Sequence, residues 1–182
     1  MSILVTGGAR SGKSGFAERL TLSLAEQAVY VATAQAFDDE MRARIDLHQQ
    51  QRGESGGQWE TLEEPHDLSA LLDRLSGGKA VLVDCLTLWL SNVLLALESE
   101  PDRQERVEQE IARLEDSVSS FQGTLVLVTN EVGDGIVPEY ALGRLYRDLA
   151  GRMNARLAAR CQQVFLVTAG IPIELKSREY KL

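Results

Sequence analysis

Near its amino terminus the chain reads Gly7-Gly8-Ala9-Arg10-Ser11-Gly12-Lys13-Ser14. This stretch fits the pattern G-x-x-x-x-G-K-[ST], in which glycines let backbone N–H groups converge on phosphate oxygens. It follows an apolar run at residues 3–5, typical of a buried strand, and precedes a segment whose apolar residues have helical spacing: Phe16, Ala17, Leu20 and Leu24. A strand, a glycine loop and a helix in this order predict a phosphate-binding loop with its anion at the helix N-terminus.

Two side chains of this loop and one carboxylate further along have predicted tasks. Lys13 is placed to reach the outer phosphates of a nucleotide, and the Ser14 hydroxyl is a candidate ligand for Mg²⁺. Asp84 follows the apolar run at residues 80–83, where a Walker B carboxylate would hold the same Mg²⁺ through water. An alternative for Asp84 is a purely structural role as the cap of the helix that follows.

Apolar runs of strand length alternate with stretches that have helical periodicity. The predicted strands are residues 3–5, 29–32, 80–83, 124–128 and 164–167, and the predicted helices are residues 14–27, 38–51, 67–75, 86–97, 103–121 and 142–162. This alternation predicts an α/β fold of the P-loop, RecA-like class, with a mostly parallel sheet and helices on both faces. Residues 171–175 can add a final antiparallel edge strand, turned back by Gly170 and Pro172.

Length and composition indicate what class of protein this chain is. The 182 residues suit one domain spanning 1–182, and 44% hydrophobic with 25% charged residues favours a soluble globular chain without a membrane span. The start has no basic region before its glycine loop, so we expect a cytoplasmic protein with Cys85 and Cys161 as reduced, buried thiols. A net charge of −8 argues against a nucleic-acid partner.

A histidine lies between two arginines in the predicted helix at residues 38–51. His48 follows Arg44 by four residues and precedes Arg52 by four, so the three side chains share one helical face and can converge on a polyanion. Neighbouring cations disfavour the imidazolium form, leaving a neutral ring that can act as a nucleophile. Spacing alone nevertheless favours an ordinary surface or core role for His48, and His66 has no assigned role.

Two further segments stand out. The helix at residues 142–162 carries five arginines that can form a positive stripe, whereas the acidic helix at residues 103–121 is most simply a solvated face. Between them, residues 130–138 form a long, partly apolar loop at the carboxyl end of a predicted strand. This loop is a candidate for holding a large acceptor or for a subunit contact.

The motifs, taken in order, resemble the bifunctional adenosylcobinamide kinase/adenosylcobinamide-phosphate guanylyltransferase family of cobalamin biosynthesis. The resemblance extends almost from end to end. Besides the phosphate loop it rests on Arg44-Ile45 with His48 and Arg52, and on the loop motif Asn130-Glu131-Val132-Gly133 with Gly135-Ile136-Val137-Pro138-Glu139. These two segments are far more specific than the phosphate loop, which many families share.

The resemblance implies two reactions: phosphorylation of adenosylcobinamide by ATP or GTP, and transfer of GMP from GTP to the resulting phosphate. It implies that His48 carries GMP as a covalent phosphoramidate, which reverses the expectation from spacing alone. It also implies a homotrimer, Mg²⁺ as the metal, and nucleotide contacts from residues 7–14, Ala32, Thr33, Ala34, Gln49, Gln50, Gln51, Arg52, Glu63 and Asp84.

Two alternatives remain open at this point. One is a simple P-loop kinase of a nucleoside or another small alcohol, in which His48 is structural. The other is a nucleotide-dependent switch protein that uses the same loop to order residues 130–138 without acceptor chemistry.

Overall fold

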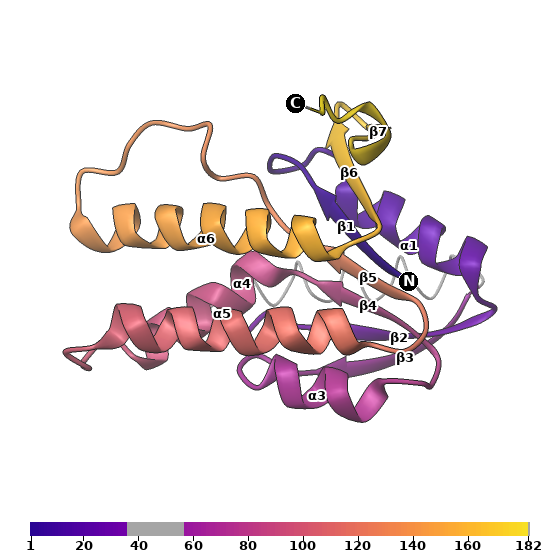
Figure 1. The fold of residues 1–182 in the computed structure, drawn as a ribbon, viewed down its shortest axis with the longest axis horizontal. Coiled ribbons are helices and arrows are strands. Elements are labelled where there is room, and N and C mark those ends of the chain that lie inside the picture. The colour runs from indigo at the N-terminus through magenta and orange to yellow at the C-terminus, as the bar shows by residue number, and fades with distance from the viewer. Residues whose placement is uncertain (36–56, 182) are drawn as a thin grey trace.

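The computed structural model describes residues 1–35 and 57–181 (Figure 1). Its strands are β1 (Ser2–Thr6), β2 (Gln27–Ala32), β3 (Gln58–Glu63), β4 (Ala80–Asp84), β5 (Leu125–Val128), β6 (Gln163–Thr168) and β7 (Ile171–Glu174). Its helices are α1 (Lys13–Leu24), α3 (Leu68–Leu75), α4 (Leu86–Ala96), α5 (Arg103–Ser120) and α6 (Ala141–Arg160), with a short 3-10 helix η1 (Lys176–Arg178). The predicted helix at residues 38–51 lies outside the described residues.

The strands form one sheet in the order β3-β2-β4-β5-β1-β6-β7. All neighbouring pairs are parallel except β6 and β7, which pair antiparallel from Phe165↔Glu174 to Thr168↔Ile171. The predicted α/β class, the mostly parallel sheet and the antiparallel final edge strand are therefore confirmed. β1 lies between β5 and β6, so β5 separates it from β4.

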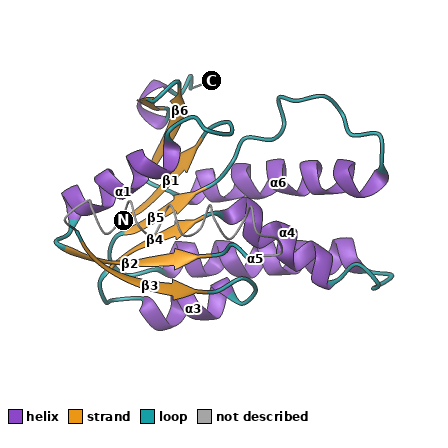
Figure 2. Ribbon diagram, turned by 180° about the vertical axis from the view of Figure 1, so that it is seen from behind, coloured by secondary structure: helices purple, strands orange, loops and turns teal. Residues whose placement is uncertain are grey.

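Helices cover both faces of the sheet (Figures 1 and 2). Alternate residues of one strand point to opposite faces. Ile3 and Val5 accordingly pack in a core cluster with Ala17 of α1, whereas Leu4 belongs to the cluster that contains Leu90 of α4 and Met153 of α6. All these side chains are at most 1% exposed, which explains why the central strands read as continuous apolar runs.

The sequence prediction was wrong at two places near the edge of the sheet. β3 was not predicted as a strand, because it has no apolar run: residues 58, 60, 61 and 63 are exposed and only Trp59 and Leu62 are half-buried. The predicted helix at residues 14–27 ends at Leu24, and Gln27 begins β2 instead. No helix of the described residues is long and apolar enough to cross a membrane.

Candidate functional site

The predicted phosphate loop joins the end of β1 to the start of α1, and two of its three glycines, Gly7 and Gly12, are required by close packing or backbone conformation. A Cβ on Gly7 would lie 2.4 Å from the Val167 carbonyl oxygen of β6. Gly12 adopts φ +92° as the N-cap residue of α1, and its Cβ would lie 3.3 Å from the Cα of Gly170. Only glycine fits both positions without displacing the backbone.

The loop carries a largely buried cation. Lys13 is 8% exposed, and its Nζ donates a hydrogen bond to the Gly8 carbonyl oxygen at 3.1 Å. Burial lowers the pKa of Lys13, while the nearby Cys85 and Asp84 oppose that shift. The hydroxyls of Thr6 and Ser11 are buried without a hydrogen-bond partner among the described residues. The loop thus holds a cation and spare polar groups, as an anion site requires.

Asp84 ends β4 on the same edge of the sheet as the phosphate loop. Its Oδ2 accepts a hydrogen bond from the Tyr30 hydroxyl of β2 at 3.3 Å, and its charge acts on the Lys13 ammonium. The N-cap position of α4 belongs to Cys85 rather than to Asp84. Asp84 therefore lies close enough to act on the charge of Lys13, although β5 separates β4 from β1, the strand that leads to Lys13.

The donor set at this edge suits Mg²⁺. Mg²⁺ in nucleotide sites is bound by one or two protein oxygens together with substrate phosphates and water. A half-buried Asp84 and the half-buried Ser14 beside Lys13 supply such oxygens. No group of three or more His, Cys, Asp or Glu residues that could hold a metal by itself occurs in residues 1–35 and 57–181.

The turn after β2, predicted to contact the nucleotide, is held by buried hydrogen bonds. The Thr33 hydroxyl donates to the Cys85 carbonyl oxygen at 2.7 Å and accepts from the Cys85 amide at 2.9 Å. The Asn92 side chain donates to the Thr33 carbonyl oxygen at 2.8 Å. Thr33 therefore has a structural task, and the half-buried Ala32 and Ala34 on either side of it lie at the carboxyl edge of the sheet.

The predicted nucleotide-contacting residues are spread along this edge. Glu63 ends β3 and pairs with Ala32 of β2, whereas the phosphate loop follows β1. Strands β2, β4 and β5 lie between β3 and β1, which at about 4.8 Å per strand spacing separates Glu63 from the loop by roughly 19 Å. Residues 7–14, Ala32–Ala34, Glu63 and Asp84 thus line an edge rather than one point. His48 and Gln49–Arg52 lie outside the described residues.

A polar network beside Asp84 joins Asn130, the first residue of the predicted acceptor loop, to Thr87 and Tyr146, for which the sequence analysis predicted no role. Asn130, two residues after β5, donates through its side chain to the Thr87 hydroxyl at 2.8 Å, and the Cys85 thiol lies 3.2 Å from the same hydroxyl. The Tyr146 hydroxyl of α6 donates to the Thr87 carbonyl oxygen at 3.1 Å. Burial, reinforced by Asp84, raises the pKa of Cys85 to about 11, so the thiol is neutral at pH 7.

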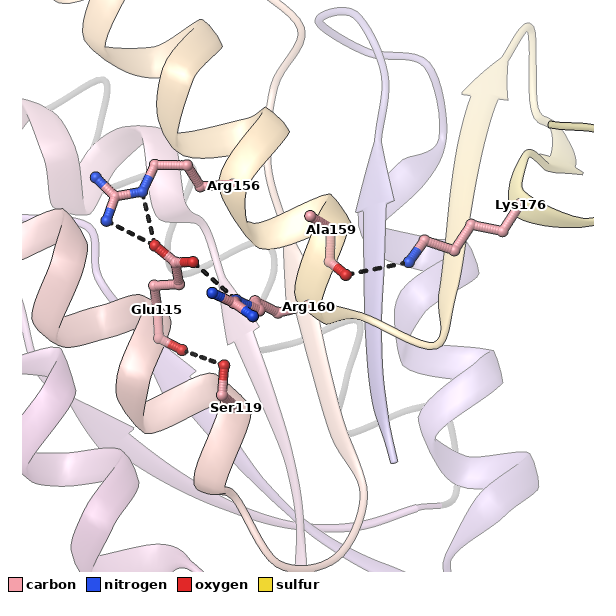
Figure 3. Close-up of polar contacts among 6 residues, drawn as sticks. All are labelled: Glu115, Ser119, Arg156, Ala159, Arg160 and Lys176. Carbon is pink, nitrogen blue, oxygen red and sulfur yellow. Dashed lines mark hydrogen bonds and ion pairs between the residues drawn. The ribbon is translucent and has the colours of Figure 1, made fainter. Parts of the chain in front are cut away.

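The arginines of α6 are not a free positive stripe. Arg152 pairs with Glu108 at 2.8 Å, and Glu115 binds both Arg156 at 2.6 Å and Arg160 at 2.8 Å (Figure 3). The other two, Arg144 and Arg147, donate to backbone carbonyl oxygens of the loop that precedes α6. The prediction of a positive stripe is therefore corrected: three of the five arginines pair with carboxylates of the acidic α5, and the other two are held by the loop.

The loop between β5 and α6 runs over the length of α6 (Figure 1). It presents Ile136, Val137 and Tyr140 with 97%, 62% and 71% of their surface exposed. Its first residues are fixed, because the Glu131 amide donates to the Gly7 carbonyl oxygen at 3.1 Å and the Asn154 side chain donates to the Asn130 carbonyl oxygen at 3.1 Å. The fixed base of this loop therefore adjoins the phosphate loop, while its apolar tip is open.

Comparison with known proteins gives a family match over most of the chain. Residues 3–175 match the model of the family described as cobinamide kinase / cobinamide phosphate guanyltransferase. The chain is 44% identical over 177 residues to the bifunctional adenosylcobalamin biosynthesis protein CobP of Pseudomonas aeruginosa, covering 97% of this chain and 98% of that protein. It is also 44% identical over 185 residues to the bifunctional adenosylcobalamin biosynthesis protein CobU of Salmonella typhimurium, covering 97% of this chain and all of that protein.

Two solved structures share part of the arrangement at low sequence identity. One is the P4 protein from bacteriophage phi6 in complex with ADP, with 14% identity, a TM-score of 0.45, and coverage of 94% of this chain and 52% of that one. The other is the RadB recombinase, with 15% identity, a TM-score of 0.45, and coverage of 91% and 73%. Since both scores are below 0.5, the fold assignment depends on the strand order given above.

Proposed function

The chain belongs to the cobinamide kinase / cobinamide phosphate guanyltransferase family, and we propose that it catalyses both reactions which that description names. In the first, ATP or GTP phosphorylates the hydroxyl of the aminopropanol arm of adenosylcobinamide. In the second, GMP from GTP is joined to the new phosphate, giving adenosylcobinamide-GDP. The observation that carries the proposal is Lys13 beside Asp84 at the edge of the sheet, in a chain that matches the family over residues 3–175.

In the kinase step the loop binds and orients the phosphates of the donor. Its N–H groups and the Lys13 ammonium, released from the Gly8 carbonyl oxygen, contact the β- and γ-phosphate oxygens. The acceptor hydroxyl then attacks the γ-phosphorus and loses its proton to water, while the bond from the γ-phosphorus to the β–γ bridging oxygen breaks and the nucleoside diphosphate leaves. Mg²⁺ bound by Ser14 and, through water, by Asp84 would neutralise part of the phosphate charge.

In the guanylyl transfer His48 is the proposed nucleophile. A ring nitrogen attacks the α-phosphorus of GTP, a P–N bond forms, and the α–β bridging bond breaks to release pyrophosphate. A phosphate oxygen of adenosylcobinamide phosphate then attacks the same phosphorus and frees His48. Ala32, Thr33, Ala34, Gln49, Gln50, Gln51, Arg52 and Glu63 are the proposed contacts of this nucleotide.

The proposal extends to assembly and location. We infer a homotrimer from the family resemblance, with residues 1–182 acting as one domain in the cytoplasm. The exposed apolar side chains of Ile136, Val137 and Tyr140 support a subunit contact or a large acceptor at the loop before α6.

The test follows the fate of the phosphorus atoms. GTP labelled at the α-phosphate should label the protein through a bond that is lost in acid and survives alkali, whereas γ-label should not remain. His48→Asn should abolish labelling and guanylyl transfer but keep phosphorylation of adenosylcobinamide, which mass analysis of the corrinoid products detects.

The other histidine of the chain supplies the matched control. His66 lies in the loop after β3, with its Nε2 3.1 Å from the Gln35 Nε2. His66→Asn should label normally. Labelling that persists in folded His48→Asn, or full guanylyl transfer without any label, contradicts the covalent mechanism and favours direct transfer between bound substrates.

A further inference from the structure

The turn between β6 and β7 has an uncommon backbone geometry. Thr168 pairs with Ile171, so Ala169 and Gly170 form a two-residue hairpin turn. Both residues have positive φ, +52° for Ala169 and +78° for Gly170, as a type I′ turn requires. The turn is thus defined by its backbone, and alanine adopts this geometry at a steric cost.

The turn and the end of β6 contact the phosphate loop at three points. The Gly170 amide donates a hydrogen bond to the Ser11 carbonyl oxygen at 2.9 Å. The Gly170 Cα lies against Gly12, and the Val167 carbonyl oxygen lies against Gly7. These contacts join residues more than 150 positions apart and are not part of the sequence motif.

The hydrogen bond from Gly170 determines the direction in which the Gly12 N–H points. A trans peptide is planar, with its C=O and N–H pointing in opposite directions. Because the Ser11 carbonyl points to the hairpin turn, the Gly12 N–H of the same peptide points away from it. Gly12 is the N-cap residue of α1, where free N–H groups and the helix dipole attract anions.

We propose that the Ala169–Gly170 turn is a positioning element for the nucleotide phosphates. Through its N–H, Gly170 fixes the Ser11–Gly12 peptide so that the loop is shaped for phosphate before a nucleotide binds. Gly170 is a positioning residue, since it acts through Ser11 and Gly12. This inference rests on the proposed nucleotide binding at residues 7–14.

The chain offers a closely matched control for Gly170. Gly77, in the turn before β4, has φ +80°, and its amide also donates to a carbonyl oxygen, that of Gln122, at 2.7 Å. A Cβ at either glycine would meet no atom within 4 Å. Gly77 lies at the amino ends of the strands, at the opposite edge of the sheet from the phosphate loop.

The experiment compares proline substitutions at the two glycines, because proline deletes the N–H donor and its ring, which fixes φ near about −65°, cannot adopt the positive φ that both glycines have. The melting temperature Tm and the Kd for GDP with Mg²⁺ are measured for wild type, Gly170→Pro and Gly77→Pro. Both substitutions should lower Tm, but only Gly170→Pro should raise the Kd, by about five-fold or more, which is the size of effect that loss of one hydrogen bond produces.

A second pair decides the question if a proline variant does not fold. Gly170→Ala and Gly77→Ala keep the backbone N–H donor, but alanine is strained at a positive φ. Asparagine adopts a positive φ more readily, so Gly170→Asn keeps the donor with less strain. We expect weaker GDP binding for Gly170→Ala and recovery in Gly170→Asn. A Gly170 variant that matches its folded Gly77 counterpart in Kd overturns the inference. Wild-type protein that binds no GDP contradicts the proposed function itself.

Discussion

Gly7→Ala should disable the phosphate loop through a steric effect that the structure locates. The added Cβ would lie 2.4 Å from the Val167 carbonyl oxygen and 2.8 Å from the Ser11 Oγ, whereas ordinary contact begins at 3.4 Å. The backbone of β6 cannot retreat, because Val167 is fully buried and pairs with Pro172 of β7. The start of the loop must therefore move by about 1 Å, which can cost about 10²-fold in turnover.

The neighbouring glycine is the comparison. Gly8 is exposed, and a Cβ there meets no atom within 4 Å, so Gly8→Ala adds the same methyl group without a clash with protein. Kinase turnover at saturating GTP and the unfolding free energy in urea are measured for both variants. Gly7→Ala should lose about 1–3 kcal/mol by overpacking and most of its turnover, and Gly8→Ala much less of either. Equal turnover and stability in the two variants would refute the packing argument.

Three further changes test other parts of the structure. Asp84→Asn should raise the Mg²⁺ concentration needed for half-maximal kinase activity by about 10-fold, as loss of an outer ligand of a metal does; an unchanged titration leaves Asp84 only its contact with Tyr30. Glu115→Gln should lower the unfolding free energy by about 1–3 kcal/mol, against less than about 0.5 kcal/mol for Glu110→Gln, whose partner Arg113 is exposed. Hydrogen bonds from Arg160 lower the pKa of Glu115 below its usual 4.5, so this loss is full above about pH 4.5 and shrinks as pH falls through the lowered pKa; a loss independent of pH contradicts the ion-pair explanation. Gly151→Ala, at an exposed position inside α6 with no atom within 4 Å, should raise the unfolding free energy by about 0.5–1 kcal/mol in urea denaturation, and a loss would reveal an undetected contact.

The central strands were predictable because they are buried on both faces and therefore read as apolar runs. β3 was not, because it is an edge strand with four exposed residues, whose strand character comes from its pairing with β2. The end of α1 was misplaced for a related reason. Residues 25–27 keep a composition compatible with a helix, and the pairing of Gln27 with Gln58 decides that a strand begins there.

In the candidate site, too, some residues could be predicted from the sequence and others could not. Lys13 and Asp84 could be named from the sequence, because the phosphate loop and the polar end of an apolar run are local patterns. Asn130, Thr87 and Tyr146 could not, because their hydrogen bonds join residues that the sequence separates by 43 and 59 positions. The sequence signals for Asn130 were its place in the loop motif that carries the family resemblance and its position two residues after a predicted strand. The α6 arginines were misjudged because their partners, Glu108 and Glu115, lie on another helix.

The residues at the end of β4 connect the phosphate loop to the turn after β2. Asp84 faces Tyr30 and Lys13, whereas the backbone of the next residue, Cys85, is bound on both its N–H and its C=O by the Thr33 hydroxyl. The two proposed reactions break different bonds, the β–γ bridge at the phosphate loop and the α–β bridge at His48. A nucleotide that takes part in both reactions must therefore be bound at more than one place along the edge of the sheet. The β4 end meets that need structurally, because its consecutive residues Asp84 and Cys85 face Lys13 of the loop and hold the turn at Ala32–Ala34.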